Sequence, residues 1–247
     1  MLSAQVERRI GRAPSVDSSL GTQLLPSVLS LIAGSADAIS FLGLGGLFTA
    51  HITGNLVILA AHISSGGSAE LAPILAVPVF IAVLAMTRAL ASGLGVIGVA
   101  SLRPLLGLQL LLLACFLILG VAAGSRIDPK APSAIIAGML GVAAMAVQNA
   151  LAQISLRGAP TTAVMTTNIT RFVMDLGTVV LERDPDAIVT ARNRARHAWP
   201  AIVGFAVGCG LGALCQAAYG LRSLALPTGL ALLALVMSFD ANRHAEA

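Results

Sequence analysis

The sequence predicts an all-α integral membrane protein with six transmembrane helices, two short or re-entrant polar segments and an internal two-fold repeat. Three observations lead to this fold class. Apolar residues make up 57% of the chain and charged residues 11%, and the mean hydropathy is +0.90; a soluble domain is usually about 25% charged. Several apolar stretches reach the roughly 20 residues that a helix needs to cross a hydrocarbon core. A short polar pattern also occurs twice within these stretches.

The apolar stretches follow the same order in two halves, residues 20–127 and 131–240, which together form a single transmembrane domain. Residues 1–19 are polar and are predicted to be a disordered cytoplasmic tail. Each half has a long first span, a shorter polar segment and two further long spans. The predicted spans are 20–43, 72–100, 105–124, 133–154, 198–219 and 223–239, and the polar segments are 48–64 and 161–181. Residues 128–132, with two prolines and two charges, are the predicted linker.

The two polar segments decide the topology. The stretch 53–65 has 13 residues, which is short for a bilayer, and the second segment is unusually polar. We therefore expect both to be partial, which gives six spans and an inverted repeat. If both cross, the chain has eight spans and the halves are parallel. Arginine retained on the cytoplasmic side places both termini inside in either topology.

The duplicated polar pattern is the best sequence clue to function. The first copy combines Asp37-Ala38 with a Thr-Gly-Asn element 18 residues on, and the second combines Gln148-Asn149-Ala150 with an element ending 19 residues after Asn149. Polar side chains at matching places in two halves point to a substrate or ion site between repeats. The candidate lining residues are Asp37, Thr53, Gly54, Asn55, Arg88, Asn149, Thr166, Thr167 and Asn168.

Several of these residues allow a structural or a functional interpretation. A lone carboxylate in a span, such as Asp37, can bind a cation or exchange a proton; it can equally be held by Arg88, by another polar neighbour or by backbone donors near the glycines at 43–46. Uncharged hydroxyl and amide groups satisfy the backbone of a broken helix, and they also bind small polar solutes. Arg171 and Asp175 are four residues apart and are predicted to form a structural ion pair on one helix face.

Other functional classes have little support. The sequence has no nucleotide-binding glycine loop, no Ser-His-Asp arrangement and no zinc-protease pattern, so we expect neither enzymatic activity nor a cofactor. Cys115, Cys209 and Cys215 lie in apolar segments and predict no metal site or disulfide. The net charge of +4 is explained by membrane topology rather than by nucleic acid. The expected partners are the lipid bilayer and a small solute or ion; nothing in the sequence indicates an oligomeric state.

The motifs also resemble those of a known family. The motif residues, listed along the chain, are Gly34, Asp37-Ala38, Phe48, Thr53-Gly54-Asn55, Gln148-Asn149-Ala150 and Thr166-Thr167-Asn168. Over about residues 24–240 the chain resembles the YoaK family, also described as domain of unknown function 1275. The family's second motif often reads Thr-Gly-Asn, and here Thr167 replaces the glycine. The resemblance implies a small bacterial multi-pass inner-membrane protein and no established substrate.

Two functions remain open from the sequence. The first is an inner-membrane transporter or channel-like protein for a small solute or ion, with its site at the repeat interface. The second is a non-transporting membrane scaffold or stress-response component, in which the polar motifs only hold broken helices together.

Overall fold

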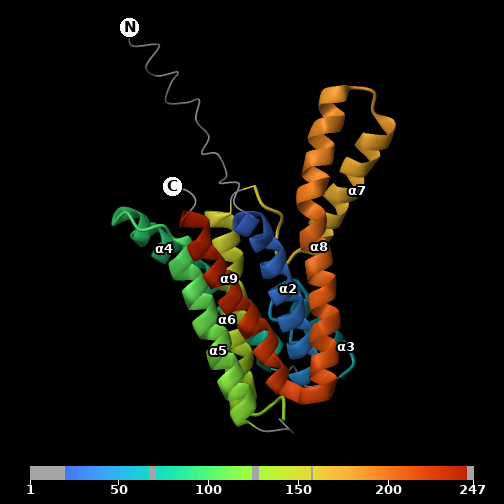
Figure 1. Cartoon of the computed structure of the whole chain (residues 1–247). Helices are drawn as coiled ribbons and strands as arrows, with labels where there is room; N and C mark the ends of the chain where they lie inside the picture. The colour runs from blue at the N-terminus through green and yellow to red at the C-terminus, as the bar shows by residue number, and fades with distance from the viewer. Residues whose placement is uncertain (1–19, 67–70, 124–127, 157, 244–247) are drawn as a thin grey trace.

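The computed structural model describes residues 20–66, 71–123, 128–156 and 158–243, and the regular structure of these residues is helical throughout (Figure 1). The predicted tail 1–19 lies outside the described residues. The helices are α2 (Leu20–Gly43), α3 (Ile52–Ser64), α4 (Leu71–Val96), α5 (Leu102–Ala122), α6 (Pro132–Ser155), α7 (Met165–Leu181), α8 (Pro185–Tyr219), the 3₁₀ turn η1 (Gly220–Leu224) and α9 (Ala225–Arg243).

Five helical stretches are long and apolar enough to cross a membrane, which identifies an all-helical, multi-pass membrane protein. They are Leu24–Gly43, Leu71–Val96, Leu102–Ala122, Pro132–Ser155 and Pro185–Phe239. The last stretch is 55 residues long and contains the turn η1, where the chain reverses between α8 and α9 (Figure 1). The short helix α3 has 13 residues and is apolar, but it is below the length of a span.

Small residues allow α2 and α8 to pack closely along their length. A Cβ atom on Gly204 would lie 2.6 Å from the carbonyl oxygen of Ser27, and one on Gly212 would lie 2.8 Å from that of Ser35. Gly208, between them, also faces a backbone carbonyl of α2. Lipid provides no hydrophobic force between helices, so close backbone approach of this kind is what holds them together.

Hydrogen bonds between helices establish their relative directions. Gln148, in the second half of α6, donates to the carbonyl oxygen of Leu29, in the first half of α2, at 2.9 Å. Gly138, in the first half of α6, lies against Leu44, just after the end of α2. Arg103, at the beginning of α5, donates to the carbonyl oxygen of Ser238, near the end of α9, at 3.2 and 3.3 Å. Helices α2 and α6 are therefore antiparallel, as are α5 and α9. The chain consequently leaves α2 and α6 at opposite ends of the bundle.

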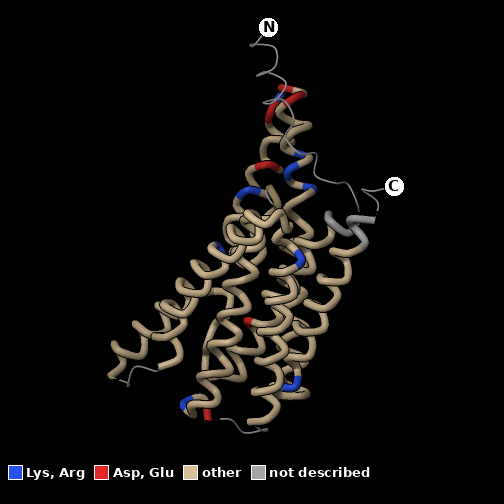
Figure 2. Tube along the Cα trace, turned by 90° about the vertical axis from the view of Figure 1, so that its left-hand side faces the viewer, with Lys and Arg blue, Asp and Glu red and all other residues tan. Residues whose placement is uncertain are grey.

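Helix α7 and the first part of α8 form an arm that extends beyond the bundle at the end where α2 begins and α9 ends (Figure 1). Charged residues gather on this arm and near the helix ends, and the middle of the bundle is almost free of them (Figure 2). The acidic residues and arginines of 182–196 predict a solvated loop, and this prediction is wrong. The Asp184 side chain accepts a hydrogen bond from the Asp186 backbone N–H, and Pro185 is the first helical residue, so an N-cap starts the 35-residue α8 there.

Candidate functional site

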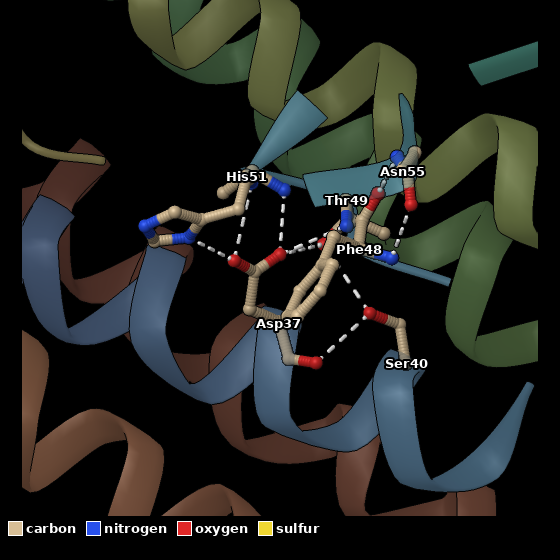
Figure 3. Close-up of polar contacts among 7 residues, drawn as sticks. Asp37, Ser40, Phe48, Thr49, His51 and Asn55 are labelled. Carbon is tan, nitrogen blue, oxygen red and sulfur yellow. Dashed lines mark hydrogen bonds and ion pairs between the residues drawn. The ribbon is translucent and has the colours of Figure 1, made fainter. Parts of the chain in front are cut away.

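The carboxylate of Asp37 lies at the centre of a loop that returns into the bundle. Asp37 is 3% exposed and lies six residues before the end of α2, so the loop 44–51 folds back about 9 Å along that helix to reach it. Its Oδ1 accepts hydrogen bonds from the backbone N–H of Thr49 at 2.8 Å, the Thr49 hydroxyl at 3.1 Å and the N–H of Ala50 at 2.6 Å (Figure 3). The side chain therefore holds the loop at this depth.

The second oxygen of Asp37 is occupied by His51. The Asp37 Oδ2 lies 2.6 Å from His51 Nδ1 and accepts the His51 backbone N–H at 3.2 Å (Figure 3). The His51 ring packs edge-on against Phe205 of α8, with ring centroids 5.4 Å apart. The expected partner Arg88 is exposed on α4 and makes no side-chain contact with Asp37 among the described residues. The carboxylate is held mainly by backbone donors because the loop brings them within its reach.

Asn55 closes the same loop from the other side. It is fully buried, it accepts the backbone N–H of Phe48 at 2.9 Å, and it donates to the carbonyl oxygen of Phe48 at 2.8 Å (Figure 3). The Phe48 ring lies against Gly54, where a Cβ atom would be 2.8 Å from a ring carbon. The position of the Phe48 ring therefore requires glycine at position 54. Asn55 supplies the hydrogen bonds that the N–H and carbonyl oxygen of Phe48 would otherwise lack in this non-helical loop.

The second loop repeats this arrangement. Asn168 is 2% exposed, accepts the backbone N–H of Thr161 at 3.3 Å and donates to the Thr161 carbonyl oxygen at 2.6 Å. In both loops the asparagine is the fourth residue of a short helix and bonds the residue seven positions earlier. Thr167 replaces the glycine at the next-to-last motif position. Its exposed side chain is accommodated because Thr161, not phenylalanine, occupies the place that Phe48 takes in the first loop.

Gln148, rather than Asn149, makes the contact that corresponds to that of Asp37. The Gln148 amide donates to the hydroxyl of Thr162 at 3.0 Å, and Thr162 follows Thr161 as Thr49 follows Phe48. The fully buried Gln109 on α5 donates to the Gln148 carbonyl oxygen at 2.7 Å. Asn149 is half-buried and donates to the Met145 carbonyl oxygen of its own helix at 2.9 Å. Asn149 therefore lies outside the contacts that hold the second loop.

The ion pair of α7 differs from the one expected. Arg194 of α8 donates to Asp175 Oδ1 through Nε at 2.9 Å and through Nη2 at 2.6 Å. Asp175 is buried, while Arg171 is exposed on another part of the helix. The prediction of an Arg171–Asp175 pair is wrong because α7 and α8 form a hairpin, and the facing helix supplies a guanidinium with two donors. This ion pair joins the two helices of the arm.

The remaining predicted residues, Thr53, Thr166 and Thr167, are exposed at the first turns of α3 and α7. Their hydroxyl groups have no hydrogen-bond partner among the described residues. No group of three His, Cys, Asp or Glu side chains suited to a metal ion occurs in that part of the chain. The site thus consists of two hydrogen-bond networks around buried Asp37, Asn55, Gln148 and Asn168, with exposed hydroxyl groups beside them.

No local pattern in the sequence indicates the partners of His51, Gln109 or Arg194. These side chains reach their partners across a returning loop, between helices or across a hairpin. Thr49 and Thr162 lie just outside the motifs, but each precedes its motif asparagine by six residues. A threonine six residues before the motif asparagine in both halves is the signal that could have identified them.

The model of a family described as Protein of unknown function (DUF1275) matches residues 25–237. Neither a curated protein nor a solved structure matches the chain.

Proposed function

The chain belongs to the DUF1275 family, whose function is unknown, and from this premise we propose that it is a transporter or channel-like protein for a small solute or ion. We place it in the inner membrane of a bacterium with both termini in the cytoplasm. Its two halves are inverted repeats that cross the bilayer six times, through α2, α4, α5, α6, the second part of α8 and α9. Helix α3 is a partial segment, and α7 does not cross because it runs from the second loop into the arm.

One observation carries this proposal: two matching loops return into the bundle from opposite ends. The first is held beside Asp37 of α2. The second is held beside Gln148, seven residues before the end of α6. Non-helical backbone at membrane depth is tolerated where it is buried in protein or lines a cavity. Paired broken helices in two inverted halves are typical of transporters, whose sites lie near the middle of the bilayer.

Within this proposal we divide the candidate residues into two roles. Asp37, Asn55 and Asn168 position the loops, because their polar atoms are engaged with the backbone. The solute contacts fall to exposed polar groups at the starts of the short helices, chiefly Thr53 of α3 and Thr166 of α7. Helix N-termini favour anionic groups of a ligand, which adds to the attraction at both places.

The engaged state of Asp37, Asn55 and Asn168 also favours the second function, a membrane scaffold that transports nothing. In that case the returning loops only shape the bundle. The two functions differ in what the exposed threonines do: a scaffold has no use for their hydroxyl groups, whereas a transporter loses contacts with its solute when they are removed.

The topology is tested by labelling single cysteines in whole cells with a membrane-impermeant maleimide. In a background in which Cys115, Cys209 and Cys215 are alanine, we expect Lys130→Cys to be labelled from outside and Arg103→Cys to be labelled only after the cells are opened. These positions flank α5, so they report its direction. Labelling of Arg103→Cys in intact cells, with Lys130→Cys protected, would sink the inverted six-span arrangement.

Transport is tested with the full chain in liposomes on a solid-supported membrane. Currents are recorded for a panel of alkali and divalent cations, ammonium, amino acids, monosaccharides and small carboxylates. We expect a current for at least one class, reduced about tenfold or more by Thr53→Val or Thr166→Val. Thr170→Val, one turn further along α7, removes a hydroxyl that bonds its own helix and serves as the matched control. Correctly folded protein that gives no current with any class supports the scaffold.

A further inference from the structure

His51 and Asp37 form a dyad in which the two imidazole nitrogens have different surroundings. His51 Nδ1 lies 2.6 Å from Asp37 Oδ2, inside the bundle (Figure 3). The Nε2 atom is on the far side of the ring and has no hydrogen-bond partner among the described residues. A carboxylate beside one ring nitrogen fixes the tautomer of a histidine. Nδ1 therefore carries a proton in the neutral ring, and Nε2 presents a free lone pair.

Both oxygens of the Asp37 side chain act as hydrogen-bond acceptors. Without counting the imidazole, it accepts three backbone N–H groups and one hydroxyl, at distances of 2.6 to 3.2 Å. Its charge has no Lys or Arg partner among the described residues. The dyad therefore has one net negative charge when His51 is neutral and none when His51 is protonated.

The exposure of the two side chains determines where a proton enters. The Asp37 side chain is 4% exposed, whereas that of His51 is 38% exposed. The ring is held by Phe48, at a centroid distance of 6.0 Å, and by Phe205 of α8. Helix α8 contributes the half-buried thiol of Cys209 to the surroundings of Asp37, and the first turn of α3 brings no charged residue. Protons therefore reach the dyad through His51 Nε2.

We propose that the Nε2 atom of His51 is a proton-binding site, and that Asp37 is the fixed countercharge that stabilises the protonated ring. The proton comes from water and forms a bond with the Nε2 lone pair, while Nδ1–H and the carboxylate keep their protonation states. Binding neutralises a charge buried in an apolar bundle. This inference rests on the proposed transport function only in one respect, namely that the proton is the coupling ion of the transported solute.

The binding site is tested without reference to transport, by ¹⁵N NMR of the histidine-labelled full chain in lipid nanodiscs. Spectra are recorded over about pH 5 to 9, the range around the ordinary histidine pKa. We expect a resonance, absent from His51→Gln, whose Nδ1 remains protonated while its Nε2 changes its protonation state. In Asp37→Asn this titration should move to lower pH by about one unit or more, because the countercharge that stabilises the protonated ring is gone. His62→Gln, on α3, is the matched control and should leave the resonance unchanged. A His51 ring that keeps one protonation state across this range overturns the proposal, and so does a deprotonated Nδ1.

The coupling role has its own measurement in liposomes that contain a pH-sensitive dye. A solute that gives a current should also move protons in the wild type, and His51→Gln should abolish the proton movement. If His51 titrates but no solute moves, the proton site stands and the transport function fails. If solute transport persists with unchanged proton movement in His51→Gln, the transport function stands and the role of His51 is refuted. Should Asp37→Asn fail to fold, the two His51→Gln comparisons decide the matter.

Discussion

Replacing Asn55 by alanine tests whether the motif asparagine is structural. Asn55→Ala leaves both the N–H and the carbonyl oxygen of Phe48 without their partners, at 2.9 and 2.8 Å in the wild type. Each unsatisfied buried group costs about 1 to 3 kcal/mol. Phe48 is half-buried, so water replaces part of what is lost. We therefore expect a destabilisation of about 2 to 3 kcal/mol, towards the lower end of the sum.

The matched control is Asn149→Ala, which removes the same side chain from the other half. Asn149 donates only to a carbonyl group of its own helix, which also has its helical hydrogen bond. Alanine is the best helix former, so the loss and the gain nearly cancel, and we expect a change within about 0.5 kcal/mol.

Thermal unfolding of the detergent-solubilised full chain, followed by circular dichroism, measures both variants. At about 2 to 4 °C per kcal/mol for a chain of this size, Asn55→Ala should lower the Tm by about 4 to 12 °C and Asn149→Ala by less than about 2 °C. Asn168→Ala should resemble Asn55→Ala because it bonds Thr161 in the same way. Equal Tm values for Asn55→Ala and Asn149→Ala would refute the structural role of the loop hydrogen bonds.

Two further predictions concern the packing of the bundle and of the arm. Gly204→Ala places a Cβ atom 2.6 Å from a backbone carbonyl of α2 and should destabilise the bundle by about 1 to 3 kcal/mol, whereas Gly210→Ala, with no atom within 4 Å, should be neutral or stabilising in the same Tm assay. Similar losses for both would contradict the close α2–α8 packing. Arg194→Gln removes the guanidinium that bonds Asp175 and should speed hydrogen–deuterium exchange in α7, because the buried carboxylate loses its partner. The Tm should hardly change, because the Arg194 side chain is 60% exposed and the arm lies beyond the bundle. Arg192→Gln, exposed on the same arm, should leave the exchange unchanged.

Most helices were predictable because an apolar stretch of sufficient length indicates each of them locally. The first span was expected at residues 20–43 and α2 occupies these residues. Apolar composition identifies such helices, and prolines or glycines mark their ends. The start of α8 was missed although Asp184-Pro185 is a clear N-cap signal, because the arginines after it favoured an interpretation as a solvated loop.

The partners of the charged residues were less predictable, because they depend on how the chain returns. Asp37 meets groups 12 to 14 residues away, and Asp175 meets one 19 residues away. A helical pattern gives neighbours only three or four residues apart. The same limit explains the wrong choice of Arg171: it is a neighbour by sequence, whereas Arg194 becomes a neighbour only when α7 and α8 form their hairpin.

The difference between the two loops lies in charge and in connections. Asp37 bonds the threonine of the first loop and Gln148 bonds the threonine of the second, so Gln148 is the counterpart of Asp37. The first loop is therefore held by a carboxylate and the second by an amide. The hydrogen bonds of the carboxylate all come from the loop, and His51 is the hydrogen-bond partner that can gain or lose a proton. The amide instead joins its loop to α2 and to Gln109 on α5, whose buried Oε1 lacks a partner among the described residues. A proton can therefore change the charge of the first loop alone, while the second keeps its place among three helices. If the protein moves a solute, we expect the proton to act on transport through the first loop.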